Sequence, residues 1–349
     1  MDEKKSSRVS VGDIARAAGV SKTSVAFALQ NRPGVSEATR ERIKKIARKL
    51  GYAPDARMDA WMARLRDAKS KDLLPIAWLN THVEEDVWRK YNYLSPYLEG
   101  ARARCLELGY RLEEVWMRRP GLTMQRLSQI LYSRGIEGVI VTHPARHLRL
   151  KWDHLASVAI GGALLTPQIH RVMTDISSNL LLAWKWVKRA GYRRIGICLS
   201  LETDRFSEHA LRSTAHYLIS TTTASNRVEP LFYTDIPKGT TEAPPELIRW
   251  LHSQKPDAII GHNRLLVQWV EGAGYRVPDE IGVVHLAVDD DVPDWTGIHS
   301  DKRGVAAAAA EWLISLIRNH RFGVPAKALN MMIRGSWQHG RTLLVPKPK

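Results

Sequence analysis

The chain has 349 residues, enough for two or three domains, and its 44% hydrophobic and 25% charged residues are ordinary for a globular protein. Two cysteines, Cys105 and Cys198, exclude a disulfide framework, no thiol and histidine set has zinc-ligand spacing, and no stretch could span a membrane. Since the charged N-terminus lacks a secretion signal, we expect a cytoplasmic protein without a metal or cofactor.

The net charge of +16 is concentrated at one end of the chain. Residues 1–70 hold 16 basic and 8 acidic side chains, which is half of the net charge in one fifth of the length. A dense positive field on a small unit favours a polyanionic partner such as nucleic acid. Charge that served solubility alone would not need this concentration.

The stretch Ser10–Asn31 predicts two short helices joined by a tight turn. Its first serine caps a helix over Val11–Ala17, and Gly19 ends that helix. Ser21 caps a second helix that runs to about Gln30, and apolar residues recur in both at helical spacing. This pattern is typical of a helix-turn-helix that enters the DNA major groove; the alternative is a helical corner in a globular core.

A third helix and a fourth short amphipathic element follow. Ser36 caps a helix over Glu37–Leu50, whose apolar face would close a three-helix core. The element Asp55–Leu65 carries an apolar stripe that includes Trp61 and Met62. A large aromatic side chain beside a basic module is either part of a core or a wedge for a minor-groove base step.

From about residue 73 apolar strands alternate with amphipathic helices, and the series occurs twice. The predicted strands of the first series are Leu74–Asn80, Arg111–Trp116, Gly138–Val141 and Val158–Gly161. Those of the second series are Arg194–Leu199, Glu229–Tyr233, Ala258–Gly261 and Gly282–Leu286. This alternation predicts two parallel sheets covered on both faces, with a ligand site beyond the carboxyl ends of the strands.

The chain resembles the LacI/GalR family of transcriptional regulators. The matching text near the N-terminus is SVGDIARAAGVSKTSVAFALQ, VSEATRERI and LGYAPDA. Further along, EGARARCLELGY, IEGVIV, LAWKWVKRAGYRRIGI, PDAIIGHN and AGYRVPDEIGVV resemble the family's effector domain. The resemblance implies an all-α three-helix DNA-binding headpiece with a hinge helix, followed by an α/β bilobed, periplasmic-binding-protein-like domain of two Rossmann-like lobes.

The resemblance also implies the domain boundaries. We expect the headpiece over residues 1–54, the hinge helix and linker over 55–72, and the bilobed effector-binding and dimerisation domain over 73–345. The family's chain crosses between its lobes three times. The first lobe would comprise about 73–161 and 293–325, including a helix over Gly304–Asn319. The second lobe would comprise about 162–292 and 326–345, including a last strand near Asn330–Arg334.

Roles in DNA binding follow from the resemblance position by position. Lys22, Thr23 and Phe27 lie where the family reads base edges. Phe27 departs from the usual polar residue, and its ring would pack on a thymine methyl group. Trp61 departs from the leucine that relatives insert into the minor groove, and it would insert there or pack on its dimer mate. The residues expected to contact DNA are Ser10, Ser21, Lys22, Thr23, Ser24, Phe27, Gln30, Asn31, Trp61 and Met62.

The effector candidates follow the ends of predicted strands. Arg212 aligns with a family arginine that grips an anionic or hydroxylated effector. Asn263 matches the first residue of a family Asn-Asp pair whose aspartate is replaced here by Arg264, and Asp289 is the nearest candidate for a carboxylate that binds sugar hydroxyls. These departures disfavour a simple hexose. The effector candidates are His82, Tyr91, Tyr93, His143, Arg212, Asn263 and Asp289.

Catalytic motifs are missing from the sequence, which contains no nucleophile elbow, Walker phosphate loop or His-Glu-x-x-His pair, so we expect no enzyme. We expect a transcriptional regulator, and a repressor rather than an activator, that binds a pseudo-palindromic operator as a homodimer. A small-molecule effector, such as a sugar or related metabolite, would control this binding. Such a protein would be associated with the nucleoid. The alternatives are a nucleoid-type architectural protein without ligand response, and an activator or a regulator that needs a co-repressor.

Overall fold

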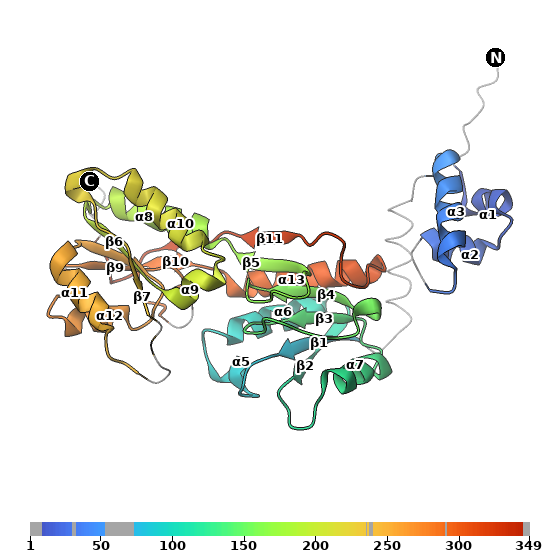
Figure 1. Cartoon of the computed structure of the whole chain (residues 1–349), viewed down its shortest axis with the longest axis horizontal. Coiled ribbons are helices and arrows are strands. Elements are labelled where there is room, and N and C mark those ends of the chain that lie inside the picture. The colour runs from blue at the N-terminus through green and yellow to red at the C-terminus, as the bar shows by residue number, and fades with distance from the viewer. Residues whose placement is uncertain are drawn as a thin grey trace, which may run out of the picture.

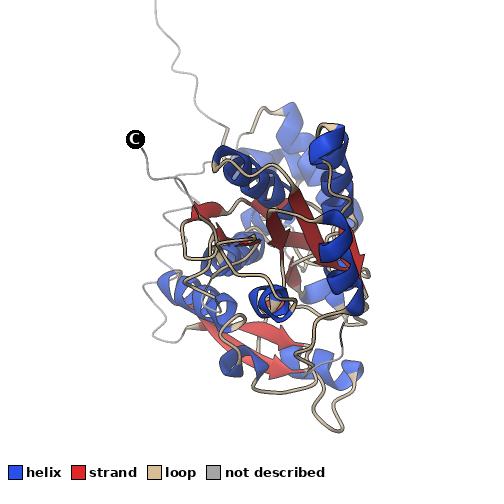
Figure 2. Cartoon of the chain, turned by 90° about the vertical axis from the view of Figure 1, so that its left-hand side faces the viewer, coloured by secondary structure: helices blue, strands red, loops and turns tan. Residues whose placement is uncertain are grey.

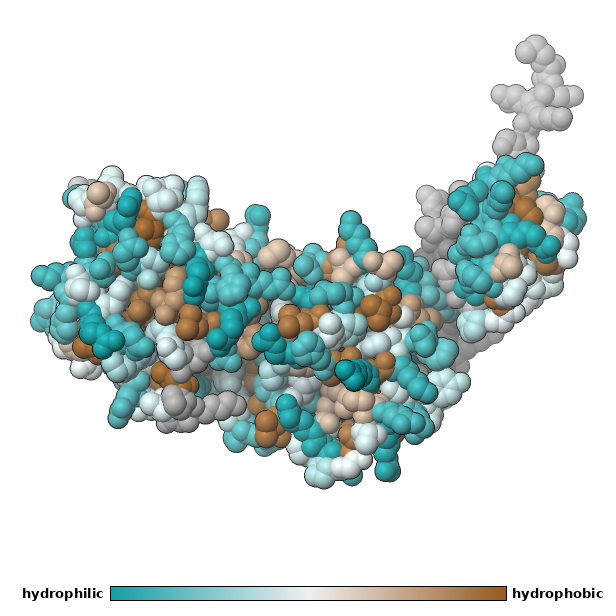
Figure 3. All heavy atoms as spheres, in the orientation of Figure 1, coloured by the Kyte–Doolittle hydropathy of each residue, from teal (hydrophilic) through white to brown (hydrophobic). Residues whose placement is uncertain are grey.

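The computed structural model describes residues 9–29, 33–52, 73–234, 236, 240–289 and 292–344. A three-helix headpiece is followed by two α/β lobes, each built on a six-stranded sheet (Figure 1). Hydrophilic residues predominate on the face shown in Figure 3, where apolar residues lie singly or in small groups. The predicted hinge over residues 55–72 lies outside the described residues, as do Gln30, Asn31, Trp61 and Met62.

The headpiece consists of α1 (Val11–Ala18), α2 (Lys22–Leu29) and α3 (Glu37–Lys49). Gly19 ends α1 in the left-handed conformation, with a φ of 63°, which a glycine adopts without steric cost. The inward faces of the three helices form one core, whose buried residues are Ile14, Ala15, Ala18, Val25, Ala28, Ile43 and Ala47. The observed helices end within one residue of the predicted bounds because caps and apolar spacing agree here.

The first lobe is a wholly parallel sheet in the order β11-β5-β4-β3-β1-β2. Its strands are β1 (Leu74–Asn80), β2 (Tyr110–Trp116), β3 (Gly138–Val141), β4 (Ala156–Ile160), β5 (His170–Thr174) and β11 (Asn330–Ile333). One face packs on α6 (Ser95–Glu107) and α13 (Lys302–Arg318), and the other on α7 (Met124–Ser133). The short α5 (Val87–Lys90) precedes α6, and a 3₁₀ turn, η1 (Trp152–His154), precedes β4.

The second lobe is a sheet in the order β12-β10-β9-β8-β6-β7, with only β12 antiparallel to its neighbour among the described strands. Its strands are β6 (Ile195–Ser200), β7 (Leu231–Tyr233), β8 (Ala258–Gly261), β9 (Gly282–His285), β10 (Gly297–His299) and β12 (Ser336–Gln338). Its helices are α8 (Ile176–Arg189), α9 (Leu201–Phe206), α10 (Ala210–Ser220), η2 (Ala224–Asn226), α11 (Pro245–Gln254) and α12 (Leu266–Gly272). Helices α8 and α10 cover one face of this sheet, while α11 and α12 cover the other. Figure 2 shows helices (blue) packed around the strands (red) of the lobes.

The lobe boundaries differ from the predicted ones. Strands β5 and β11 pair with each other in the first lobe, whereas the sequence assigned both segments to the second lobe. Strand β10, assigned to the first lobe, pairs with β9 in the second. The chain therefore crosses between the lobes near Asp175, Ser300 and Arg334. Helix α13 returns to the first lobe, as predicted.

The composition of these strands explains the wrong assignments. Strand β5 begins with the buried polar residues His170 and Arg171, so it presents no apolar run. Strand β11 is an edge strand whose Asn330, Met331 and Met332 are exposed. The pattern therefore did not mark β5 as a strand, because the hydrophobic signal of a parallel strand depends on burial on both faces. The strand expected near Asn330–Arg334 is present as β11, but in the other lobe.

A search of the described residues for a helix long and apolar enough to cross a membrane finds none.

Candidate functional site

The second headpiece helix presents its predicted DNA-contacting residues at its first turn. The Ser21 hydroxyl accepts a hydrogen bond from the Ser24 backbone N–H at 3.0 Å and lies 2.9 Å from the Ser24 hydroxyl, so it caps α2. Lys22 and Thr23 are exposed beside this cap. The cap keeps the helix start rigid while leaving these two side chains accessible.

A groove runs between the starts of α1 and α2. Its volume is about 620 Å³, and its lining residues are Ser10, Gly12, Ala15, Arg16, Gly19, Val20, Ser21 and Lys22. Ser10 caps α1 in a capping box: it accepts from the Asp13 N–H at 3.3 Å and donates to an Asp13 carboxylate oxygen at 2.7 Å. Helix N-termini with basic side chains nearby suit a phosphate backbone.

Phe27 is half-buried on α2. A β-carbon at Gly34 would lie 3.5 Å from ring carbon Cδ2 of Phe27, so the ring rests against the loop that leads to α3. Part of the ring therefore stabilises the headpiece, and the rest is available at the surface. The contacts of Phe27 with bases stay a prediction.

At the facing edge of the first lobe, two predicted effector residues come together. His82 follows β1 and His143 follows β3, and their ring centroids are 5.5 Å apart. The sequence did not single out Trp88 or Tyr97, which join this group: Trp88 lies 5.4 Å from each histidine and Tyr97 lies 6.4 Å from His143. Burial, and secondly the neighbouring His82, lowers the pKa of His143 to about 4, so its imidazole is neutral at pH 7.

Tyr91 and Tyr93 form a separate pair at the same edge, with ring centroids 5.6 Å apart. The guanidinium of Arg264 in the second lobe lies 5.8 Å from the Tyr93 ring. This cation–π contact joins the two lobes. The residue that departs from the family's Asn-Asp pair therefore meets one of the predicted tyrosines across the lobes.

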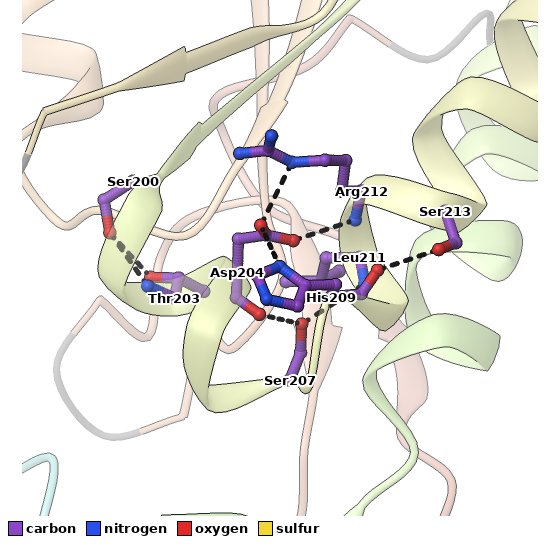
Figure 4. A network of polar contacts seen from close by, with 8 residues as sticks. All are labelled: Ser200, Thr203, Asp204, Ser207, His209, Leu211, Arg212 and Ser213. Carbon is purple, nitrogen blue, oxygen red and sulfur yellow. Dashed lines mark hydrogen bonds and ion pairs between the residues drawn. The ribbon is translucent and has the colours of Figure 1, made fainter.

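Arg212, at the start of α10, is held by Asp204, as Figure 4 shows, and by Phe232. Its Nε lies 3.0 Å from a carboxylate oxygen of Asp204, and its guanidinium lies 4.4 Å from the Phe232 ring. The side chain of Arg212 is 39% exposed, whereas that of Asp204 is 1% exposed. These contacts fix the stem and leave the terminal nitrogens directed away from Asp204, ready for a planar oxyanion or a pair of hydroxyls.

Asn263 is turned toward its own lobe. Its side-chain oxygen accepts from the Leu265 N–H at 2.8 Å, and its amide nitrogen donates to the Tyr233 hydroxyl at 3.3 Å. Beside it, His262 stacks on His285 with centroids 5.4 Å apart. Burial is the main cause that lowers the pKa of His262 to about 4 and that of His285 to about 3. The sequence had not selected these two histidines, although His262 follows β8 and His285 is the last residue of β9.

Asp289 is buried in a polar network at a crossover between the lobes. It pairs with Lys302 at 3.0 Å and accepts hydrogen bonds from the Ser300 hydroxyl at 2.5 Å and the Ser300 N–H at 3.1 Å. Both carboxylate oxygens are therefore engaged by protein donors. This geometry gives Asp289 a bracing role at the crossover.

Chemical sites of other kinds are not apparent in the part of the chain that the structure describes. No group of three His, Cys, Asp or Glu residues there could hold a metal ion. Both cysteines are buried, and burial raises the pKa of the Cys105 thiol to about 12 and raises that of Cys198 as well. These thiols are poorly suited to nucleophilic chemistry.

Two family models match the chain. Residues 10–55 match the bacterial regulatory proteins of the lacI family, and residues 186–336 match the periplasmic binding protein-like domain. Among curated proteins, the HTH-type transcriptional repressor PurR of Vibrio vulnificus is 24% identical over 331 residues, covering 88% of this chain and 92% of PurR. The HTH-type transcriptional regulator PtxS of Pseudomonas plecoglossicida is 25% identical over 351 residues, covering 94% of this chain and 96% of PtxS.

Solved structures show the same fold. The lac repressor dimer bound to operator and the anti-inducer ONPF superposes with a TM-score of 0.56 at 17% identity, covering 97% of this chain and 100% of that chain. The complex of the transcriptional regulator CelR with cellobiose superposes with a TM-score of 0.55 at 17% identity, covering 96% and 100%. The chain therefore combines a DNA-binding domain of the lacI family with a periplasmic-binding-protein-like domain, and it is similar over most of its length to HTH-type transcriptional regulators.

Proposed function

We propose that this protein is a repressor that binds a pseudo-palindromic operator as a homodimer, and that a small molecule bound between its lobes changes its affinity for DNA. The observation that carries this proposal is the capped start of α2, which presents Lys22 and Thr23 on a basic headpiece attached to a bilobed domain. One headpiece reads few base pairs, so two-fold pairing is needed for useful discrimination. Bound to its operator, the protein would be associated with the nucleoid.

The ligand site of this proposal lies at the facing edges of the two sheets. Arg212 would grip an oxyanion or hydroxyl pair, and His82, His143 and Tyr97 would line the opposite lobe. The ligand of CelR in its solved complex is cellobiose. A sugar or a related metabolite is the ligand class that we propose for this chain.

DNA selection tests the first half of the proposal. Selecting from a random library with the full-length protein should enrich an inverted repeat, and binding to it should weaken steeply as salt rises. Lys22→Ala should reduce affinity for the selected site by about tenfold, equivalent to the ~1.4 kcal/mol expected of one base contact.

Lys45→Ala is the matched control, because Lys45 is an exposed lysine of the same headpiece that lies on α3. It removes the same charge and should have a smaller effect that does not depend on sequence. Enrichment of no motif, with equal losses for both variants, would favour the architectural alternative over a repressor.

A further inference from the structure

We infer that Asp204 is a positioning residue that ties Arg212 to an ion pair between the lobes, Arg171–Glu208, so that ligand occupancy and the relative position of the lobes are coupled. The inference rests on the proposed function in one respect, which is the ligand's contact with Arg212. The contacts themselves are independent of the ligand's identity.

The ion pair joins the two lobes through a buried guanidinium. Arg171 lies on β5 of the first lobe and its side chain is only 5% exposed. One terminal nitrogen donates to a Glu208 carboxylate oxygen at 2.9 Å, while the other donates to the Leu164 carbonyl at 2.5 Å and to Gln168 at 3.1 Å. Because a buried cation is stabilised only when paired, the position of Glu208 in the second lobe matters to the first lobe.

The same part of the second lobe touches the first lobe through its backbone. A β-carbon at Gly162, in the loop that follows β4, would lie 2.7 Å from the Phe206 carbonyl oxygen. Only glycine permits this approach without a shift of the chain. The segment from Phe206 to His209 is therefore seated directly on the first lobe.

This segment adopts a rare backbone conformation. Glu208 and His209 are adjacent and both have positive φ values, 51° and 64°, although neither is a glycine. Such residues persist only where surrounding contacts hold them, and they cluster at switch regions. Here the holding contacts come from Asp204, whose carboxylate accepts from His209 at 2.8 Å and whose carbonyl accepts from the Ser207 hydroxyl at 2.8 Å.

Asp204 also holds Arg212, which makes it the common partner of the turn and of the ligand-gripping side chain (Figure 4). Its Oδ1 accepts a hydrogen bond from the Arg212 backbone N–H at 3.2 Å, and its Oδ2 lies 3.0 Å from the Arg212 Nε. A ligand that pulls on the guanidinium therefore acts on the carboxylate that maintains the turn. The turn contains Glu208, and Glu208 forms the ion pair with Arg171 of the first lobe.

Distance measurement between the lobes tests this coupling. Spin labels on Tyr132→Cys in α7 and Tyr217→Cys in α10 would report the separation, since both tyrosines are exposed and both native cysteines are buried. We expect Glu208→Gln to shift the distance distribution to longer or broader values. Glu107→Gln is the matched control, because Glu107 is equally exposed, at 61%, and pairs within α6 of the first lobe.

The role of Asp204 is tested by a double-mutant cycle. Asp204→Asn should shift the same distance although Asp204 touches only the second lobe among the described residues. Combined with Glu208→Gln it should add nothing further, whereas combined with Glu107→Gln its effect should be unchanged. If Asp204→Asn fails to fold, Arg212→Met, at a side chain 39% exposed, replaces it in the cycle.

Unchanged distances in Glu208→Gln, or full additivity of the Asp204 and Glu208 variants, would overturn the inference. Operator binding by the same proteins, measured without ligand, separates this failure from failure of the proposed function. If the distances show no coupling but the unmodified protein binds its operator, only this inference is wrong. Absence of operator binding by the unmodified chain removes the proposed function.

Discussion

At the scale of single residues, Phe27 on α2 occupies a position where the family resemblance leads us to expect a polar side chain. Its ring rests against Gly34 and is only half-buried, so it combines a packing role with an exposed apolar edge. An aromatic edge offers a base no hydrogen bond, but it matches the methyl group of thymine. We therefore predict that Phe27 contributes shape and apolar contact, but no hydrogen bond, to DNA recognition.

Replacing the thymine that contacts Phe27 by uracil removes one methyl group and should weaken operator binding by about 0.8 kcal/mol. Titration of operators with T, U or C at each step of the half-site checks this expectation. The same substitutions tested on Phe27→Ala should show no preference. Equal binding of all three bases by the unmodified protein would contradict apolar recognition.

His285 provides a second test at this scale, through the dependence of stability on pH. It is 5% exposed, and burial, then His262, lowers its pKa to about 3. The unfolded chain takes up a proton near pH 6.5 that the folded chain does not, so stability falls as the pH drops from 7 to 5. For this group the loss is about 2 kcal/mol.

Urea unfolding at pH 7 and pH 5 measures that loss. His285→Asn should reduce the pH dependence by this group's share, since an amide does not titrate but still accepts from the Ala287 N–H, while His143 and His262 keep their own shares. His154→Asn, at an exposed histidine, should leave the dependence unchanged. An identical pH dependence for His285→Asn and the unmodified protein would refute the assignment.

At the scale of elements, the first lobe depends on the close packing of α6 against α13. A β-carbon at Gly100 of α6 would lie 2.2 Å from the Arg303 carbonyl oxygen, so the two helices meet backbone to backbone at this point. Apolar residues beside it complete the contact, including Ala101, Val305 and Ala309. Gly100 is therefore required for its small size.

Gly100→Ala should destabilise the protein by about 2 kcal/mol, because the methyl group overpacks a rigid contact. Gly272→Ala is the control: Gly272 ends α12, a β-carbon there would have no neighbouring atom within 4 Å, and the variant should gain about 0.5 kcal/mol from helix propensity. Chemical denaturation of both variants measures the difference. A gain in stability for Gly100→Ala would show that the helices do not pack as described.

Sequence patterns predict elements well where local signals agree. Serine caps, a glycine stop and apolar spacing located α1, α2 and α3 within one residue. They missed β5, and the strand expected near Asn330–Arg334 was found as β11 but in the other lobe, since the pairing of these two strands across 159 residues leaves no local signal. Strands of only three residues, such as β10 and β12, are too short to give a recognisable pattern in the sequence.

The candidate site shows the same limit. Strand ends indicated His82 and His143, which the structure does bring together. Trp88, Tyr97, His262 and His285 were missed because their neighbours come from other elements, and Asp204 because a buried carboxylate looks like any surface one in a sequence. Asn263 and Asp289 were correctly placed at strand ends, but their side chains serve the fold.

At the scale of the whole molecule, three crossovers connect the lobes and polar contacts brace them. Asp289 pairs with Lys302 at one crossover, while Asp175 lies 3.5 Å from Arg334 where the other two run side by side. Connections of this kind allow the lobes to move as units about a fixed axis. A ligand changes DNA binding only by preferring one arrangement of the lobes, and DNA must then change ligand affinity by the same factor.

The most direct test of the account is operator binding by the full-length protein, titrated at fixed salt with and without ligands found by a thermal-shift screen of sugars, sugar acids, nucleosides and phosphorylated metabolites. The account expects specific binding of a dimer to an inverted repeat, and at least one ligand that changes its affinity by fivefold or more, about 1 kcal/mol of coupling. Arg212→Met should abolish the ligand effect, because it removes the side chain proposed to hold the ligand. Binding that ignores DNA sequence and responds to no ligand would contradict the account.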